Sequence, residues 1–232
     1  MESPRSIRRA LLFDFDGLIV DTETMWAEIV IDALREDGVT IRMDDVRHLV
    51  GVAGHEFDEA WMRFSDAHLS EQLDRKTLMA RVWPRCAETF PTLEVLPGVV
   101  ELMAGARDRG WRTGLGTGSQ MQTVGPRLDH HGLRENFDAI VTIDDVERGK
   151  PSPDIYLTLA DRLEVAPESC IVLEDSVHGC EAALAAGMRV IACPCGVTRG
   201  SAFPADATVV ASLLEIDLGS VTPASAPLRR ST

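Results

Sequence analysis

The chain has 232 residues, of which 45% are hydrophobic and 26% charged, and this balance is typical of a globular protein with one large domain or one domain with an insertion. The formal net charge of −14 at pH 7 argues against binding to nucleic acid or to an anionic membrane. The five cysteines are irregularly spaced and no apolar stretch is long enough to span a bilayer, so we expect a cytoplasmic protein without a disulfide framework.

The first predicted strand covers residues 9–15 and carries an aspartate at residue 14, with a second at residue 16. Asp14 and Asp16 are separated by one residue, so in a strand their side chains point to the same side. A carboxylate at the end of a buried strand costs free energy unless a partner compensates for it. Gly17 follows and lets the chain turn away sharply. The pair therefore indicates a functional site. Taken without the other motifs, the two aspartates could also be turn residues or the cap of a helix.

The segment from residue 21 to residue 90 contains no convincing β pattern. Its first part places apolar residues on one stripe at helical spacing, in ETMWAEIVIDALREDG. The same pattern is found in HEFDEAWMRFSDAHL and in DRKTLMARVWPRCAETF. We expect a small helical domain here, with Trp26, Trp61 and Trp83 in its core.

Strand patterns return after Pro91 and alternate with helical patterns that end in glycine. Near-continuous apolar runs cover residues 111–116, 139–143, 170–174, 188–192 and 207–211. Such runs are typical of strands buried on both faces of a parallel sheet, and their alternation with helices predicts a doubly wound α/β fold. We expect a core of residues 1–20 and 91–218, an inserted helical cap of residues 21–90, and a disordered tail of residues 219–232.

Polar residues follow four of the predicted strands. Ligands of an open α/β sheet bind outside the carboxyl ends of the strands, so these positions matter most for function. Beyond Asp14 and Asp16, they are Thr117, Gly118 and Ser119 after the second strand, Lys150 after the third, and Glu174 and Asp175 after the fourth. Because these strand ends share one edge of the sheet, we expect their side chains to meet in one cleft.

The negative charges expected in this cleft require a bound cation to balance them. Two unit charges at about 4 Å repel each other by roughly 4 kcal/mol at an effective dielectric constant of about 20. Lys150 alone cannot balance the carboxylates of Asp14, Asp16, Glu174 and Asp175. All of these donors are oxygen atoms, which favours Mg²⁺ over Zn²⁺. A magnesium ion beside a lysine suits a phosphate ester as substrate.

The two aspartates can divide the chemistry of phosphoryl transfer between them. A free aspartate has a pKa of about 3.9, so Asp14 would be ionised at pH 7 and could attack phosphorus to form an aspartyl-phosphate. Asp16 could protonate the leaving alcohol and later accept a proton from the attacking water. The phosphoryl oxygens would be held by Thr117, the backbone N–H groups of Gly118 and Ser119, and Lys150.

Four segments resemble the four motifs of the haloacid dehalogenase superfamily, in the same order: DFDGLIVDTE, GLGTGS, RGKPSPDIY and VLEDSVHGCEAALAAGM. They are most similar to its β-phosphoglucomutase-like phosphatase branch, which carries a helical cap after the first strand. The resemblance implies Asp14 as nucleophile, Asp16 as acid and base, and Thr117 and Lys150 as phosphoryl ligands. It also implies Mg²⁺ held by Asp14, the backbone carbonyl of Asp16, Asp175, and Glu174 directly or through water.

Departures from the branch favour plain hydrolysis of a small phosphorylated metabolite, such as a sugar phosphate. Trp26, Gly54 and Gln120 stand where β-phosphoglucomutases carry a histidine, an arginine and a lysine. A phosphomutase nevertheless remains an alternative, and a non-enzymatic phospho-receiver domain is another. We expect a monomer, with a weak dimer as the alternative.

Overall fold

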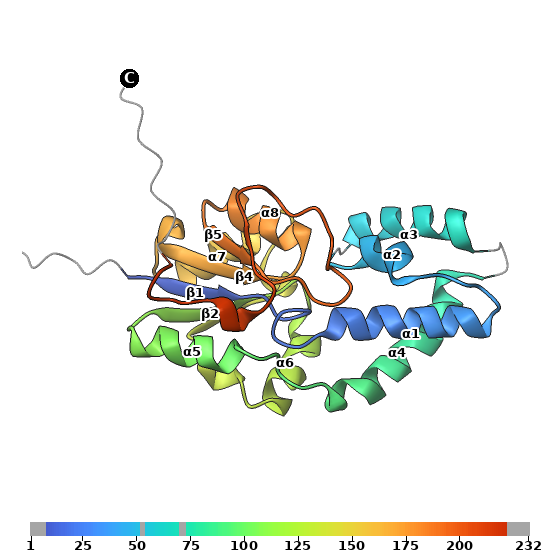
Figure 1. The fold of residues 1–232 in the computed structure, drawn as a ribbon, viewed down its shortest axis with the longest axis horizontal. Helices are drawn as coiled ribbons and strands as arrows, with labels where there is room; N and C mark the ends of the chain where they lie inside the picture. The colour runs from blue at the N-terminus through green and yellow to red at the C-terminus, as the bar shows by residue number, and fades with distance from the viewer. Residues whose placement is uncertain (1–7, 52–53, 70–72, 222–232) are drawn as a thin grey trace, which may run out of the picture.

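The computed structural model describes residues 8–51, 54–69 and 73–221. Six strands form one parallel sheet in the order β3-β2-β1-β4-β5-β6, which places β1 at its centre (Figure 1). The strands are β1 (Ala10–Phe13), β2 (Arg112–Gly116), β3 (Ala139–Val141), β4 (Cys170–Glu174), β5 (Arg189–Ala192) and β6 (Thr208–Val209). The predicted doubly wound parallel sheet is confirmed.

The central strands are buried on both faces, as their apolar sequences predict. Every residue of β1 and of β4 is buried, and Phe13 is in register with Leu115 on one side and Leu173 on the other. The last strand differs from the prediction, because β6 has only two residues and both are exposed. An edge strand has a neighbour on one side only, so it needs less apolar sequence than a central strand.

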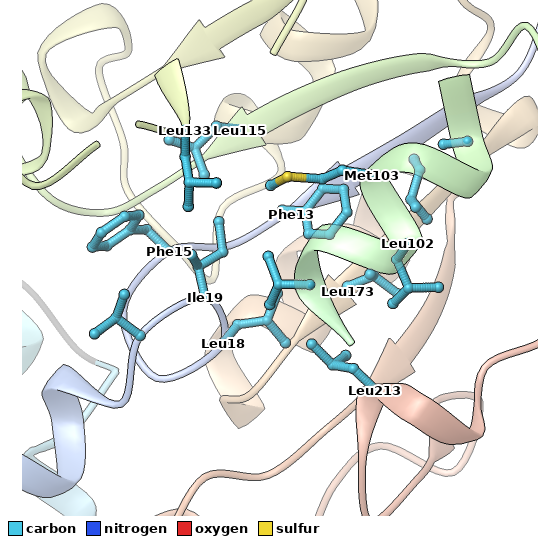
Figure 2. Close-up of a cluster of buried hydrophobic side chains, with 14 of the residues drawn as sticks. Phe13, Phe15, Leu18, Ile19, Leu102, Met103, Leu115, Leu133, Leu173 and Leu213 are labelled. Carbon is cyan, nitrogen blue, oxygen red and sulfur yellow. The ribbon is translucent and has the colours of Figure 1, made fainter. Parts of the chain in front are cut away.

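Helices cover the two faces of the sheet. They are α5 (Val99–Asp108) and α6 (Met121–His130) on one face, and α7 (Asp154–Arg162) and α8 (Val177–Ala185) on the other (Figure 1). Alternate residues of β1 serve the two sides, since Leu11 and Phe13 pack with α5 and α6 whereas Ala10 and Leu12 pack with α7 and α8. Figure 2 shows the first of these clusters, with Phe13 among leucines from β2, β4 and α5.

Between β1 and α5 the described residues form four helices that pack into a hydrophobic cluster of their own beside the sheet (Figure 1). They are α1 (Thr22–Glu36), α2 (Met43–Val46), α3 (Gly54–His68) and α4 (Arg75–Thr89), and a short 3₁₀ turn, Phe90–Thr92, follows α4. The side chains of Asp21 and Asp74 cap α1 and α4 by accepting bonds from backbone N–H groups. The exact division at residues 21–90 stays a prediction.

Two of the three tryptophans predicted to lie in the core of the helical segment are found there. Trp26 and Trp61 are buried in the cluster of α1–α4, but Trp83 is 56% exposed, so the prediction that it belongs to this core is wrong. Trp83 lies on the side of α4 that faces a cavity rather than the neighbouring helices. Within the predicted tail, Val221 is buried against the sheet core, and residues 222–232 lie outside the described residues.

Candidate active site

The ends of β1, β2 and β4 and the loop after β3 meet at one cavity of about 500 Å³, which lies between the sheet and the helices of residues 22–89. Seven of the eight predicted site residues line it: Asp14, Asp16, Thr117, Gly118, Ser119, Lys150 and Asp175. The eighth, Glu174, is fully buried and lies behind Lys150. The topology therefore brings together every residue that the sequence analysis selected, although they come from four separate segments.

Lys150 joins two of the predicted carboxylates. Its Nζ lies 2.5 Å from Asp14 Oδ1 and 2.6 Å from Glu174 Oε1. Burial raises the pKa of Asp14 to about 7, and Glu174 and Asp16 add to the rise whereas Lys150 opposes it. Burial alone would lower the pKa of Lys150, but Asp14 and Glu174 outweigh it and raise this pKa above its ordinary value. Lys150 is therefore a permanent cation at the base of the cavity.

Glu174 is held by five donors. Its Oε1 accepts hydrogen bonds from Lys150 and from the Tyr156 hydroxyl at 2.7 Å. Its Oε2 accepts from the backbone N–H groups of Asp175 and Ser176, both at 3.1 Å, and from the Ser176 hydroxyl at 3.0 Å. Burial raises the pKa of Glu174, but Lys150 and these bonds outweigh it, so the net shift is downward. In this arrangement Glu174 anchors Lys150, and direct coordination of a metal by Glu174 stays a prediction.

Asp175 is a buried carboxylate for which the described residues supply no cationic partner. Among the described residues no Lys, Arg or His side chain pairs with it, and its contact with the Thr198 hydroxyl is 3.5 Å long. Burial, with Glu174 and Asp14 nearby, raises the pKa of Asp175 well above its ordinary value. Gly17, at a φ of 86°, passes so close that a Cβ there would lie 2.2 Å from Asp175 Oδ2. A buried acid in this position indicates a missing positive charge.

The donor set fits a hard divalent cation. Asp14, Glu174 and Asp175 each place one carboxylate oxygen within 4.8 Å of the others. All three donors are oxygens, which suits Mg²⁺ or Ca²⁺ and not a soft metal. A cation here would also supply the charge that Asp175 lacks. The described residues therefore form a candidate metal site of the predicted kind.

Asp16 has partners that are separate from those of Asp14. Its Oδ1 accepts hydrogen bonds from the Thr22 hydroxyl and from Arg127, both at 2.7 Å, and its Oδ2 accepts from the Ser119 hydroxyl at 2.6 Å. The sequence analysis assigned no role to Thr22 or to Arg127. Thr22 does lie within the segment DFDGLIVDTE, whereas nothing in the helical pattern around Arg127 distinguishes it from a surface residue.

The loop after β2 lies opposite the two aspartates. Thr117 is almost fully buried, and its Oγ1 accepts a hydrogen bond from the backbone N–H of Ser119 at 3.0 Å. This N–H is therefore occupied, and the role predicted for it in holding a phosphoryl oxygen stays untested. Gly118 borders open space, because a Cβ built there would meet no atom within 4 Å. Its backbone is accessible to a ligand in the cavity.

The helices of residues 22–89 supply the opposite wall of the cavity. This wall contains aromatic and apolar side chains and one acid: Glu23, Met25, Trp26, Leu49, Phe57, Trp83 and Cys86. Burial, with Asp16 and Asp14 nearby, raises the pKa of Glu23 to about 8. Leu49 and Gly51 also line the cavity.

Comparison with known proteins identifies the family. Residues 11–193 match the family described as haloacid dehalogenase-like hydrolase. Hexitol phosphatase B of Escherichia coli strain K12 is 33% identical over 198 residues, which are 84% of this chain and 86% of that protein. Fructose-1-phosphate phosphatase YqaB of the same strain is 32% identical over 181 residues, which are 78% of this chain and 94% of that protein.

Solved structures agree with this assignment. The crystal structure of CbbY from Rhodobacter sphaeroides in complex with phosphate has a TM-score of 0.70 and 28% identity, covering 90% of this chain and 96% of that chain. The β-phosphoglucomutase of Clostridium difficile has a TM-score of 0.71 at 22% identity, with 92% and 95% covered, and thus shares the fold. The predicted resemblance to the β-phosphoglucomutase-like branch is confirmed, and the receiver-domain alternative loses its support. The chain belongs to the haloacid dehalogenase-like hydrolase family.

Proposed function

We propose that this chain is a Mg²⁺-dependent phosphatase that hydrolyses a small phosphorylated metabolite, such as a sugar phosphate, through an aspartyl-phosphate on Asp14. The observation that carries the proposal is the position of Asp14, which lines the cavity beside Lys150 and within reach of Asp175. A carboxylate nucleophile, a fixed cation and an acidic metal site at one point are the parts that phosphoryl transfer needs. The names of the two Escherichia coli relatives support a phosphate ester of a sugar or sugar alcohol.

In the first step Asp14 attacks phosphorus. A bond forms between its carboxylate oxygen and phosphorus, the bond to the leaving oxygen breaks, and that oxygen takes a proton from Asp16. In the second step a water gives a proton to Asp16 and its oxygen bonds to phosphorus. The bond from phosphorus to Asp14 then breaks, which releases inorganic phosphate and restores the Asp14 carboxylate. Each step passes one proton through Asp16, so the enzyme returns to its starting state.

Three other groups would hold the phosphoryl group. Lys150 Nζ is fixed by Glu174 on one side and Asp14 on the other, so it can stabilise negative charge on the phosphoryl oxygens without first being ordered. The Thr117 hydroxyl and the backbone of Gly118 lie at the same cavity. Thr117 Oγ1 already accepts from the Ser119 N–H, which leaves its proton free to point at a phosphoryl oxygen.

The metal would be held by Asp14, Asp175 and the backbone carbonyl of Asp16. When bound, Mg²⁺ would neutralise charge on the phosphoryl group and bring it into line with the nucleophile. The side chain of Asp16 is already committed to Thr22, Ser119 and Arg127. This supports a role for its carbonyl, rather than its carboxylate, as a ligand.

The phosphomutase alternative is less well supported. A mutase must grip a second phosphate, and the cavity wall near α1 offers the bulky side chain of Trp26 instead of a basic group. Trp26 is 8% exposed and packs edge-on against Phe57, with ring centroids 6.4 Å apart. Among the described residues the cationic side chains that line the cavity are Lys150 and Arg127, and both already bind aspartates. This favours transfer to water.

The proposal is tested by measuring phosphate release from a panel of sugar, sugar-alcohol, nucleotide and small organic phosphates, with Mg²⁺ or with EDTA. We expect metal-dependent release from at least one sugar or sugar-alcohol phosphate. Formation of a phosphate isomer, with little release, would favour the mutase. No release and no isomer from any compound would refute phosphatase action on metabolites of this kind.

A further inference from the structure

Arg127 occupies a position in the cavity that the mechanism above does not use. Its guanidinium Nη1 lies 2.7 Å from Asp16 Oδ1, and the two side chains are 21% and 15% exposed. The two residues are 111 positions apart in the chain, and Arg127 reaches Asp16 from the last turn of α6. Removing one partner of an ion pair with so little exposure costs more than removing a surface charge, because the remaining charge is left uncompensated, and Asp16 is left with a weaker set of donors.

The three partners of Asp16 differ in what they can do. The hydroxyls of Thr22 and Ser119 can rotate, so each can donate to a carboxylate or accept from a carboxylic acid. A guanidinium has donors only and keeps its charge at any pH that an enzyme meets. Arg127 therefore binds the ionised form of Asp16, whereas Thr22 and Ser119 accommodate both forms.

Arg127 is also held in place from its other side. Its guanidinium lies over the ring of Phe90, with Cζ 4.9 Å from the ring centroid. Phe90 is 9% exposed and packs edge-on against His130 and His131 at the end of α6. The guanidinium is thus seated between an aromatic ring and the carboxylate, and it needs little further ordering to bind Asp16.

We propose that Arg127 is a positioning residue that holds the Asp16 side chain in the orientation needed to accept a proton in the second step. This rests on the proposed function, in which Asp16 first gives a proton to the leaving alcohol and then takes one from water. After the first transfer Asp16 is a carboxylate, the form that Arg127 binds. In the second step the water proton passes to Asp16, the water oxygen bonds to phosphorus, and the bond between phosphorus and Asp14 breaks. Loss of the guanidinium therefore slows this step and spares the first.

The test separates the two steps with three variants. Arg127→Met removes the charge and keeps an apolar stem over Phe90, whereas Arg127→Lys keeps the charge. Arg134→Met is the matched control, because Arg134 pairs with Asp129 at 2.6 Å and neither residue lines the cavity. Rapid quenching in a single turnover measures the rise and decay of protein-bound phosphate. The probe is 4-nitrophenyl phosphate, whose leaving group needs no proton, and an alkyl phosphate is compared with it.

We expect the decay of protein-bound phosphate in Arg127→Met to slow by about tenfold or more, which is less than the roughly 10²–10⁴-fold that general base catalysis contributes, because Asp16 itself is kept. Its formation from 4-nitrophenyl phosphate stays within about twofold of wild type. Arg127→Lys recovers part of the decay rate, and Arg134→Met behaves as wild type. Equal slowing of formation and decay, or no change in either, would overturn the inference while leaving the phosphatase intact. A wild-type protein that forms no protein-bound phosphate would instead refute the aspartyl-phosphate mechanism, and this inference with it.

Discussion

At the scale of single residues, the candidate site holds more negative side chains than positive ones. Lys150 is shared by Asp14 and Glu174, Arg127 is bound to Asp16, and Asp175 is left without a cation among the described residues. Burying an acid without a partner costs several kcal/mol in an apolar setting, so such an acid either keeps its proton or binds a metal. This imbalance would favour binding of a cation at the candidate metal site.

Removing the Tyr156 hydroxyl should loosen the anchor of Lys150. The hydroxyl donates to Glu174 at 2.7 Å, and Lys150 Nζ lies 5.0 Å from the centroid of the Tyr156 ring. Tyr156→Phe keeps the ring and deletes one donor to a buried carboxylate, which costs about 1.5–3 kcal/mol. We expect urea unfolding to report a loss of this size, together with reduced kcat. Unchanged stability and unchanged kcat would contradict the anchoring role of Glu174.

Charged and hydroxyl residues of the candidate site could be predicted from the sequence because they end a strand or lie in the loop after one. Asp14, Asp16, Thr117, Lys150, Glu174 and Asp175 lie at positions that a parallel sheet must bring to one edge. Tyr156 and Arg127 could not be found in this way. They lie within α7 and α6, and their contact with the site depends on how those helices pack onto the sheet.

At the scale of elements, the first turn of α8 is built around the Glu174 carboxylate. Ser176 caps the helix by accepting from the Gly179 N–H at 3.1 Å, and its own N–H and hydroxyl donate to Glu174. Gly179 lies so close that a Cβ there would be 1.8 Å from Glu174 Oε1. The end of β4 and the start of α8 therefore form one unit that fixes the position of Lys150.

Gly179→Ala should damage this unit. The added methyl overlaps the buried carboxylate, and overpacking of a filled site costs about 1–3 kcal/mol. We expect a lower thermal midpoint and a loss of kcat in Gly179→Ala. Gly118→Ala is the control for folding, because a Cβ at Gly118 meets no atom within 4 Å. Equal thermal midpoints for wild type and Gly179→Ala would show that the turn can move aside, contrary to this account.

The central elements could be predicted from the sequence more accurately than the peripheral ones. The run at 170–174 coincides with β4, since a strand with neighbours on both sides and helices on both faces needs continuous apolar sequence. The apolar runs at 139–143 and 207–211 extend beyond β3 and β6. These two strands lie at the edges of the sheet, where a strand has a neighbour on one side only and its length is less tightly fixed by an apolar sequence.

At the scale of the whole molecule, the candidate active site lies where the sheet and the helices of residues 22–89 meet, and the whole chain has a net charge of −14. Acidic groups from both sides line the cavity, with Glu23 on α1 facing Asp14 and Asp175 on the sheet side. Within the described residues no helix is both long and apolar enough to cross a membrane. Because these acidic groups gather at the cavity, a divalent cation bound there would stabilise the folded state as well as take part in the reaction.

Stability without metal should fall as pH rises from about 5, above the unfolded-state pKa of both acids, to about 8. Burial raises the pKa of Asp14 to about 7 and that of Glu23 to about 8, so the folded state holds protons that the unfolded state has already lost. Each group then destabilises the fold by up to about 1.4 kcal/mol per pH unit until its folded-state pKa is passed. Urea unfolding in EDTA measures this fall, and Glu23→Gln should reduce it. A flat or rising stability in EDTA would contradict the buried, proton-holding state of these acids.

Metal binding should reverse this trend. Mg²⁺ binds the ionised carboxylates of Asp14 and Asp175, so its affinity rises with pH and binding releases protons. At a concentration about 100-fold above its dissociation constant, the ion should add about 2.7 kcal/mol to the free energy of unfolding. Thermal unfolding with and without Mg²⁺ checks this, and Asp175→Asn should lose most of the gain. An equal gain in Asp175→Asn would place the ion elsewhere.

The account depends most directly on one covalent bond, between phosphorus and the Asp14 carboxylate. The decisive measurement is to quench the enzyme during turnover of a substrate from the panel and to map the phosphorylated peptide by mass spectrometry, for wild type and for Asp14→Asn. We predict a phosphoryl group on Asp14 in the wild type, and neither modification nor phosphate release in the variant. Phosphate release that persists in Asp14→Asn, or a phosphoryl group on another residue, would contradict the proposed nucleophile and the mechanism built on it.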